Sequence, residues 1–514
     1  MRPMPGASGS TLQESSYLPA SRRTWMLGGL ALLFFIASAV AICLTRRPWW
    51  DEGLFGDVAM NFRDSGHFGS RALDTTGFLL FPGVHQYTYW QFPLYFVAVG
   101  SWLRLLPGTV VTMRLFSAAC GLVYLVCWFL LARRLSRNEP LAIYITSLLA
   151  VHWEVLRAAS EARMDMMCAA LGIAAMAAFF CLKESNSSRA VFVAGCFGAA
   201  AMFSHPMGVL INVVLVSLVF WHRNEIRWTG LAAAIAPYIL GGALWLAYIL
   251  EAPHMFAAQV RSQRGVRVGG LLATLANVLN DFTQRYLTAY WFVLNGYVKG
   301  KIVLLVFCVI GLLAVAMDRR LRSQALGRVL LLLIIVCYLG VALVDNMKFN
   351  MYLIYTLPPM TACGVFWLYS QWRERGRFRI AASVLAGAFA VTSFLGIAAR
   401  IHQNEWKSTY TPAVNVIRAG LPPGGLLFGG SEFGFAFGFQ PWLVDDRWAG
   451  FVTNQRPDVF VTNECYRIEI DGEATRKLFK GLQAYLRKNY HVVFQKAPYV
   501  IYYLNRNSTA VESR

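Results

Sequence analysis

Charged residues are scarce in this 514-residue chain, and acidic residues are the scarcest. Asp, Glu, Lys and Arg together make up 14% of the sequence, whereas hydrophobic residues make up 57%. The mean hydropathy is +0.47. Soluble domains carry about 25% charged residues, so this composition excludes a soluble enzyme of this length. We conclude that the chain crosses a membrane several times.

The sequence also lacks the cysteine pattern of a disulfide framework. Nine of the ten cysteines lie in apolar runs, and only Cys465 lies in a polar stretch. No fixed-period repeat is present, and no small-residue cleavage site follows the first apolar run. We therefore expect that run to be an uncleaved membrane anchor, preceded by a disordered cytoplasmic segment at residues 1–23.

Eleven apolar stretches approach the roughly 20 residues that span about 30 Å of hydrocarbon. They lie at 24–44, 113–132, 140–157, 164–182, 189–204, 206–221, 229–250, 291–317, 327–344, 350–369 and 379–399. A twelfth stretch, 93–106, is shorter and contains Arg104, which favours a helix lying at the membrane surface.

The distribution of positive charge selects one topology. Lys plus Arg number 47 against 27 Asp plus Glu, an excess that in a soluble protein suggests nucleic acid. If 93–106 does not span, however, the five internal clusters all fall on the cytoplasmic side. We therefore predict a multi-pass plasma (inner) membrane protein with a cytoplasmic N-terminus and no nucleic-acid partner. Its long outer segments are 45–112, 251–290 and 400–514.

The composition changes again after the last predicted span. Residues 401–514 contain more charge, a Pro-Pro-Gly-Gly sequence at 422–425, and short β-like runs that alternate with helical segments. This pattern predicts a small extracytoplasmic α/β domain behind a transmembrane domain at 24–400. Its glycines lack phosphate-loop spacing and indicate tight turns. We expect an accessory or acceptor-docking role for this domain.

The first outer segment opens with two adjacent carboxylates. Asp51 and Glu52 follow Trp49-Trp50 and precede apolar residues at helical spacing. The tryptophans mark the interface, so the carboxylates are predicted to head a helix on the membrane surface. A structural alternative is that Asp51 is only the N-cap of that helix.

A second acidic cluster lies between the third and fourth predicted spans. Glu161 and Asp165 are four residues apart, which predicts one helix face, and with Asp51 they could surround one cavity. Ionisable groups at this depth are costly unless they are paired or face water, which makes them candidates for a functional site. The alternative is an ion pair between Arg163 and Asp165 that only positions the helix.

Two outer segments supply candidate phosphate ligands. Lys348 and Tyr352 are one helical turn apart and could bind the same lipid phosphate, although Lys348 could also reach lipid headgroups without a catalytic role. The large outer loop has guanidinium groups that suit phosphate recognition or non-specific lipid attraction. Its polar and basic residues are Gln259, Arg261, Gln263, Arg264, Arg267 and Arg285.

These motifs, in this order, resemble the C superfamily of glycosyltransferases that use polyprenyl-phosphate sugars. The resemblance is to the protein O-mannosyltransferase and lipid A aminoarabinose transferase group and covers about 24–400. It is carried by Asp51-Glu52, Gln91-Phe92-Pro93-Leu94-Tyr95-Phe96, Arg114-Leu115-Phe116-Ser117, Arg163-Met164-Asp165-Met166, Ser204-His205-Pro206, and Lys348 with Tyr352. Two positions depart from the family pattern: Gln91 stands where a cation is common, and Leu54 stands where some members have Arg.

The resemblance implies an enzyme that moves a sugar from a polyprenyl phosphate to an acceptor on the outer membrane face. Asp51 would be the general base, with Asp165 and Glu52 as further catalytic carboxylates. The implied substrate-binding residues are Arg114, Arg163, Arg264, Lys348, Tyr352, Gln91 and Tyr95. A divalent metal is left open, with Glu161, Asp165 and His205 as its candidate ligands.

One carboxylate acting as base predicts inversion at the anomeric carbon, whereas a second carboxylate on the opposite face of the sugar would permit retention. The acceptor is left open between a glycolipid, a polysaccharide and a protein. A transporter or flippase is the alternative class, because charged groups and interrupted helices also suit transport. The ionisable residues gather at one surface instead of the midplane, which favours the enzyme.

Overall fold

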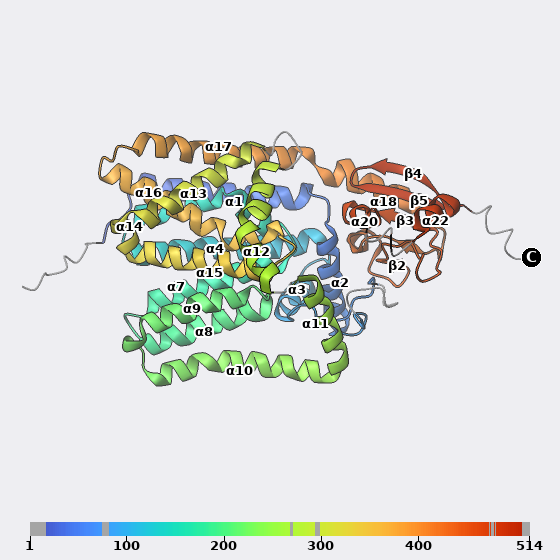
Figure 1. The fold of residues 1–514 in the computed structure, drawn as a ribbon, viewed down its shortest axis with the longest axis horizontal. Helices are drawn as coiled ribbons and strands as arrows, with labels where there is room; N and C mark the ends of the chain where they lie inside the picture. Colours follow the sequence, from blue (N-terminus) through green and yellow to red (C-terminus); the bar gives the residue numbers. More distant parts are fainter. Residues whose placement is uncertain are drawn as a thin grey trace, which may run out of the picture.

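The computed structural model describes residues 17–73, 82–267, 271–292, 299–471, 473, 477 and 480–505. Most of the chain forms a bundle of long helices, and a small sheet domain lies at one end of it (Figure 1). The bundle contains α1 (Arg22–Thr45), α4 (Val110–Ser136), α5 (Glu139–Ala150), α6 (Trp153–Ala159), α7 (Met164–Leu182), α8 (Ser187–Ser204), α9 (Gly208–Trp221), α10 (Trp228–Glu251), α13 (Ile302–Met317), α15 (Ala325–Val344), α16 (Leu357–Arg373) and α17 (Arg379–Gln403).

The sequence predicts eleven spans, but fewer of the described helices are both long and apolar enough to cross a membrane. Eight are long and apolar enough to cross a membrane, or nine if α5 and α6, which meet at 64°, form one broken span. The two other predicted spans correspond to α9 and α13, which have 14 and 16 residues. Part of the predicted span 291–317 lies outside the described residues, and η2 (Phe282–Phe292) and η3 (Lys299–Lys301) precede α13 in the described part.

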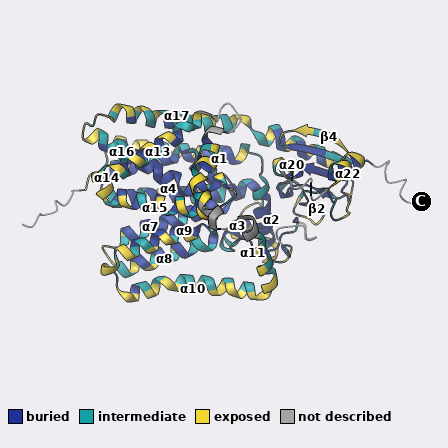
Figure 2. Cartoon of the chain, viewed as in Figure 1, coloured by how far each residue is buried: buried dark blue, intermediate teal, exposed yellow. Residues whose placement is uncertain are grey.

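The helices bury an apolar core and leave apolar residues outside, as a lipid environment requires. Burial is highest in α7 and in the segment that contains α16, whereas the apolar window of α10 has no buried residues. Exposed residues line α10 and α17 in Figure 2. The protein is therefore a multi-pass membrane protein whose margins are formed by α1, α10 and α17.

The predicted surface helices of the first outer segment are present. Helix α2 (Trp50–Ser65) begins directly after the first span, and α3 (Leu94–Leu105) has only 12 residues. The N-cap of α2 is Trp49, whose backbone N–H donates to Glu52 Oε2 at 2.9 Å. Asp51 lies in the first turn of α2, so the alternative that it is the N-cap is wrong.

Three short helices connect the later spans, and the segment before α16 is a single turn. They are α11 (Pro253–Arg267), α12 (Leu271–Asp281) and α14 (Arg319–Ser323), with the turn η4 at Asn350–Tyr355. At the N-terminus, residues 1–16 lie outside the described part. Residues 17–23, predicted to be disordered, instead contact α5: Ala20 N–H donates to Glu139 Oε2 at 2.9 Å.

The C-terminal part is the α/β structure that the sequence predicts. Five strands lie in the order β2-β1-β3-β5-β4: β1 is parallel to β2 and β3, and β5 is antiparallel to β3 and β4. The strands are β1 (Leu427–Phe428), β2 (Leu443–Val444), β3 (Val459–Thr462), β4 (Tyr490–Lys496) and β5 (Tyr499–Leu504). The helices are α18 (Thr411–Gly420), α19 (Gly434–Phe437), α20 (Glu464–Asp471) and α22 (Leu482–Asn489), with the turn η6 (Ser431–Phe433).

This domain packs directly on α2. A Cβ added to Gly53 would lie 2.2 Å from the backbone N of Glu432, so only glycine permits the close approach of α2 and η6. Trp50 Nε1 donates to Asp445 Oδ2 at 2.7 Å. The C-terminal domain therefore fixes the first turn of the helix that carries Asp51.

Candidate active site

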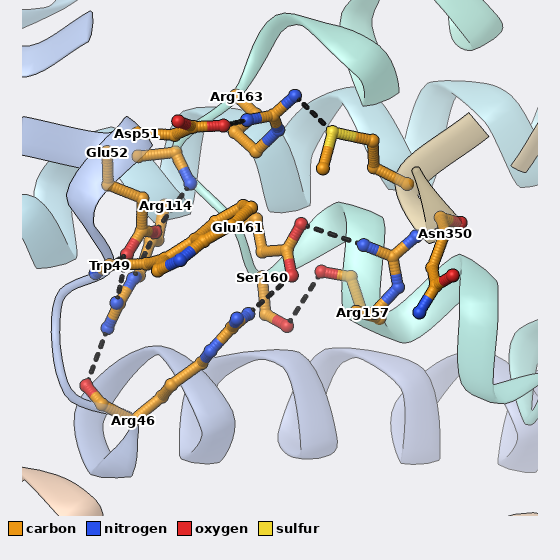
Figure 3. A network of polar contacts seen from close by, with 12 residues as sticks. Arg46, Trp49, Asp51, Glu52, Arg114, Arg157, Ser160, Glu161, Arg163 and Asn350 are labelled. Carbon is orange, nitrogen blue, oxygen red and sulfur yellow. Dashed lines mark hydrogen bonds and ion pairs between the residues drawn. The ribbon is translucent and has the colours of Figure 1, made fainter. Parts of the chain in front are cut away.

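One arginine joins the two carboxylates that the sequence singles out. Arg163 lies immediately before α7 and forms an ion pair with Asp51 on α2 (Figure 3). Its Nε lies 2.9 Å from Asp165 Oδ2. The guanidinium carbon also lies 5.3 Å from the ring centroids of Trp49 and Phe55. Asp51 is 21% exposed, whereas Arg163 and Asp165 are buried. Asp51 is therefore the member of this cluster that solvent or a ligand can reach.

The second carboxylate, Glu52, is fully enclosed. Arg114 Nε lies 2.8 Å from Glu52 Oε1, and the Ala162 N–H donates to the same oxygen at 2.8 Å. Arg114 also donates to the carbonyl oxygens of Cys43, Arg46 and Arg47. Burial opposes ionisation of Glu52, but the Arg114 guanidinium holds the pKa of that carboxyl below its ordinary value.

Glu52 and Arg114 are predicted to be a catalytic and a substrate-binding residue, respectively. Both side chains have 0% exposure, so neither can touch a substrate as the protein stands. Instead, the pair connects four parts of the chain: the end of α1, the start of α2, helix α4, and Ala162, the residue before Arg163. Its geometry is that of a positioning pair beneath the Asp51 cluster.

Glu161 does not share a helix face with Asp165, contrary to the sequence prediction. Helix α7 begins only at Met164, so Glu161 lies in the preceding turn and its side chain points elsewhere. Its two oxygens accept from Arg46 at 2.7 Å and from Arg157 at 3.0 Å (Figure 3).

A cationic pocket of about 210 Å³ lies beside Glu161, at the ends of α1, α6, α13 and α17. Every charged residue in its wall is basic: Arg46, Arg157, Lys301 and Arg400. The three arginines form ion pairs with carboxylates outside the wall: Arg46 with Glu161, Arg157 with Glu154, and Arg400 with Glu405. Lys301 instead lies 4.2 Å from the Trp153 ring centroid, and among the described residues no carboxylate is within ion-pair distance of it. The pocket is thus suited to an anion.

The sequence predicts that Lys348 binds a lipid phosphate, but its ammonium group is already paired within the protein. Its Nζ lies 2.8 Å from Asp281 Oδ1 and donates to the carbonyls of Asn277 and Ala342. Arg285, another predicted phosphate contact, is buried between Asp281 and Asp345. These four charges neutralise one another, since a buried charge needs a partner. The cluster therefore links α12, η2 and the loop before η4.

The other predicted substrate contacts are placed differently. Tyr352 packs its ring against His205, with centroids 5.8 Å apart. Gln91 and Tyr95 are buried, and Gln91 Oε1 and the Tyr95 hydroxyl have no hydrogen-bond partner among the described residues. Such orphan groups are uncommon in folded proteins and indicate a contact that a ligand or water supplies. Arg264 lies on α11, but its side chain is outside the described residues.

The described residues do not fit the predicted metal site. Asp165 Oδ1 and His205 Nε2 lie 3.8 Å apart, but Glu161 is held between two arginines. No group of three His, Cys, Asp or Glu side chains converges in the part of the chain that is described. A structural zinc site needs four ligands and a catalytic one usually three, so we derive no step through a metal.

The C-terminal domain adds a buried carboxyl that sequence analysis did not single out. Glu432 Oε1 accepts from Asn463 at 3.0 Å, whereas Oε2 has no hydrogen-bond partner within the described part of the chain, although the Arg47 charge is near. Burial, opposed by the Asn463 hydrogen bond, raises the pKa of Glu432 from 4.5 to about 7. The backbone of Ser431 and Glu432 lies directly against Gly53 of α2.

We expect Glu432 to make the stability of the protein pH-dependent. The pKa of Glu432 is higher in the folded state than in the unfolded state. Between pH 4.5 and about 7 the folded state therefore keeps the carboxyl proton, whereas the unfolded state loses it. Stability should therefore fall as the pH rises through that window, by up to about 3 kcal/mol. Thermal unfolding in detergent should show a smaller decrease from pH 5 to pH 8 for Glu432→Gln than for the wild type. Equal decreases would contradict this assignment.

Sequence reasoning missed the cations of the pocket. Arg46, Arg157, Lys301 and Arg400 lie far apart in the chain and share no motif. A usable signal is their position, because Arg46, Lys301 and Arg400 lie close to the ends of the apolar helices α1, α13 and α17. Single basic residues at such ends are usually assigned to lipid headgroups, which conceals a site that four helices build together.

The comparisons with known proteins identify the fold. No family model and no curated protein matches the chain. ArnT from Cupriavidus metallidurans bound to undecaprenyl phosphate superposes with a TM-score of 0.61 at 13% identity, covering 94% of this chain and 98% of that one. The apo oligosaccharyltransferase of Archaeoglobus fulgidus gives 0.56 at 12% identity, covering 91% and 73%. Archaeal AglB in complex with an inhibitory peptide and a dolichol-phosphate gives 0.53 at 11%, covering 96% and 75%.

These neighbours share the helical bundle, and the alignments extend over nearly the whole of this chain. The Archaeoglobus fulgidus enzyme has also been solved in complex with Zn and sulfate, at a TM-score of 0.55. At 11–13% identity such likeness establishes architecture, while activity has to be argued from the site. The chain therefore has the fold of ArnT and of the archaeal oligosaccharyltransferase.

Proposed function

We propose that this protein is an integral-membrane glycosyltransferase that moves a sugar from a polyprenyl-phosphate donor to an acceptor hydroxyl. The observation that carries the proposal is the Asp51–Arg163–Asp165 cluster at the start of α2 and α7. Two of the fold neighbours were solved with undecaprenyl phosphate and dolichol-phosphate. The predicted topology places the cluster at the outer face of a plasma (inner) membrane.

The exposed carboxylate suits a general base. Asp51 would accept the proton of the acceptor hydroxyl as that oxygen attacks the anomeric carbon and the C1–O bond to the phosphate breaks. General base catalysis contributes about 10²- to 10⁴-fold. Arg163 holds Asp51 in place, and Asp165 in turn orients Arg163. Because Asp165 is buried behind the arginine, a single base and inversion of configuration are the outcome that this geometry supports.

The leaving group is a lipid phosphate, which needs cations as its charge grows. We assign this role to the cationic pocket of Arg46, Arg157, Lys301 and Arg400, in place of Lys348 and Arg285. Gln91 and Tyr95 each have a polar atom without a hydrogen-bond partner among the described residues, and they stay predicted substrate contacts. Arg264 and Tyr352 stay predicted ligands of the donor phosphate. The acceptor, whether glycolipid, polysaccharide or protein, would dock beside the C-terminal domain.

Removing Lys301, which forms no ion pair with any carboxylate among the described residues, should weaken donor binding. Lys301→Gln is expected to raise the KM for the donor lipid about tenfold, since a charge-assisted contact to phosphate is worth about 1.5–3 kcal/mol, and to lower kcat as well, because the phosphate gains charge as it leaves. Arg320→Gln, which removes an exposed arginine of α14 away from the pocket, is the matched control and should leave KM unchanged. A normal KM for Lys301→Gln would place the phosphate elsewhere.

The function itself is tested by supplying membranes that contain the protein with labelled polyprenyl-phosphate sugars. A glycosyltransferase should consume one of them and release polyprenyl phosphate, and Asp51→Asn membranes should not. A transporter or flippase would move the labelled lipid between leaflets without cleaving it. Intact donor in every sample, with the label redistributed across the bilayer, would overturn the proposal.

A further inference from the structure

A second basic cavity lies at the other end of the helical bundle, and the proposed transfer reaction does not use it. It has a volume of about 370 Å³ and is built from the ends of α4, α7 and α9 and the start of α15. Arg134 is 20 residues beyond Arg114 on α4, which is about 30 Å along a helix. The cavity therefore opens at the opposite membrane surface from the Asp51 cluster.

The charges in the cavity wall do not balance. Arg134 and Arg137 share Glu184, while Lys183 and His222 each lie 3.0 Å from Glu225. Arg328 stacks its guanidinium 4.8 Å from the Trp221 ring centroid, and no carboxylate within the described ranges lies within ion-pair distance of it. Four Lys and Arg side chains thus meet two carboxylates.

The cavity is also continuous with the lipid-facing surface. Leu218, Trp221 and Val329 form its apolar wall. Trp221 is 48% exposed, so this apolar wall reaches the surface of the helical bundle. A soluble anion would gain nothing from these side chains, whereas acyl chains would pack against them.

We infer that this cavity binds the phosphate headgroup of an anionic glycerophospholipid, with Arg328 as the principal phosphate contact. The excess of two positive charges suits a phosphodiester, and basic pockets between helices at a cytoplasmic surface are suited to such headgroups. Trp221 holds the Arg328 guanidinium by stacking, which leaves its N–H groups free to donate. The lipid would wedge between α9 and α15 and hold the ends of α7 and α9 together.

The full-length protein in nanodiscs of equal phosphatidylglycerol and phosphatidylcholine provides the test. Native mass spectrometry should show retained phosphatidylglycerol, and Arg137→Gln/Arg328→Gln should reduce that retention about thirtyfold, as expected for two lost phosphate-facing charges. The control Arg375→Gln/Arg377→Gln removes two exposed arginines from the turn between α16 and α17 and should retain the lipid.

Equal loss in both double variants would overturn the inference, because it would show attraction to the whole surface. Undiminished retention in the Arg137/Arg328 variant would also overturn it. Inorganic phosphate at the same concentration should not displace the lipid, and displacement would assign the cavity to a soluble anion instead. Arg328→Lys keeps the positive charge and controls for loss of lipid through misfolding. It should retain the lipid and should have an unchanged unfolding temperature in phosphatidylcholine alone.

Discussion

Asp51→Asn is expected to lower sugar transfer by at least about 10³-fold while the protein still binds the donor lipid. The amide keeps the shape of the side chain but cannot accept the proton of an acceptor hydroxyl, and general base catalysis supplies about 10²–10⁴-fold. The ion pair with Arg163 is also lost, which adds misalignment to the loss of the base. Single-turnover transfer and donor binding, measured separately, check both parts of the prediction.

The matched control is Asp64→Asn at the far end of α2. Asp64 is also paired with an arginine, Arg63, but it is 38% exposed and lies outside the Asp51 cluster. Its replacement should leave transfer within about twofold, as for most surface substitutions. If Asp51→Asn instead lost donor binding in proportion to transfer, Asp51 would be a substrate contact and not the base.

Glu52→Gln is expected to reduce the stability of the protein by about 3–5 kcal/mol, because it leaves the buried Arg114 without its counter-charge. The carboxylate accepts hydrogen bonds from Arg114, Trp49 and Ala162. Its loss should therefore loosen the junction of α1, α2 and α4 as a unit. Thermal unfolding in detergent, compared with the wild type, measures the effect.

A double substitution separates a structural pair from a catalytic one. Glu52→Leu/Arg114→Leu removes both buried charges and should unfold at a higher temperature than Glu52→Leu alone, since no unpaired charge is left. If Glu52 touched the substrate, the single variant would instead keep its unfolding temperature and lose turnover. That result would restore Glu52 to the catalytic group.

The sequence predictions that the structure confirms were based on local patterns in the sequence. The two tryptophans and the helical spacing behind Asp51 predict α2, and the shortness of 93–106 predicts α3. The composition change after residue 400 predicts the sheet domain. Each of these features follows from a stretch of about 15 consecutive residues or from the amino-acid composition of a segment. Predicting them therefore needs no knowledge of contacts between distant residues.

The predictions that failed depend on partners distant in the chain. The position of Lys348 at the membrane surface predicts a lipid phosphate as its anion, but Asp281, which is distant in the sequence, forms the ion pair instead. Glu161 and Asp165 match a helical spacing, yet the helix begins between them. Pairings of this kind are decided by how helices pack, which a spacing rule cannot see.

The C-terminal domain gains a clearer role from the structure than from the sequence. It holds Trp50 through Asp445 and touches Gly53 through Glu432. These contacts flank Asp51, so movement of the domain would be transmitted to the first turn of α2. Two discrete arrangements of this contact would be needed before it could be called a switch.

Cysteine labelling at position 51 tests most directly whether this carboxylate faces a donor lipid outside the membrane. In a Cys465→Ser background, Asp51→Cys should react with a membrane-impermeant maleimide added from outside, and polyprenyl phosphate should protect it. Labelling only after the membrane is permeabilised, or labelling that polyprenyl phosphate does not slow, would contradict the placement of Asp51 at the site of transfer.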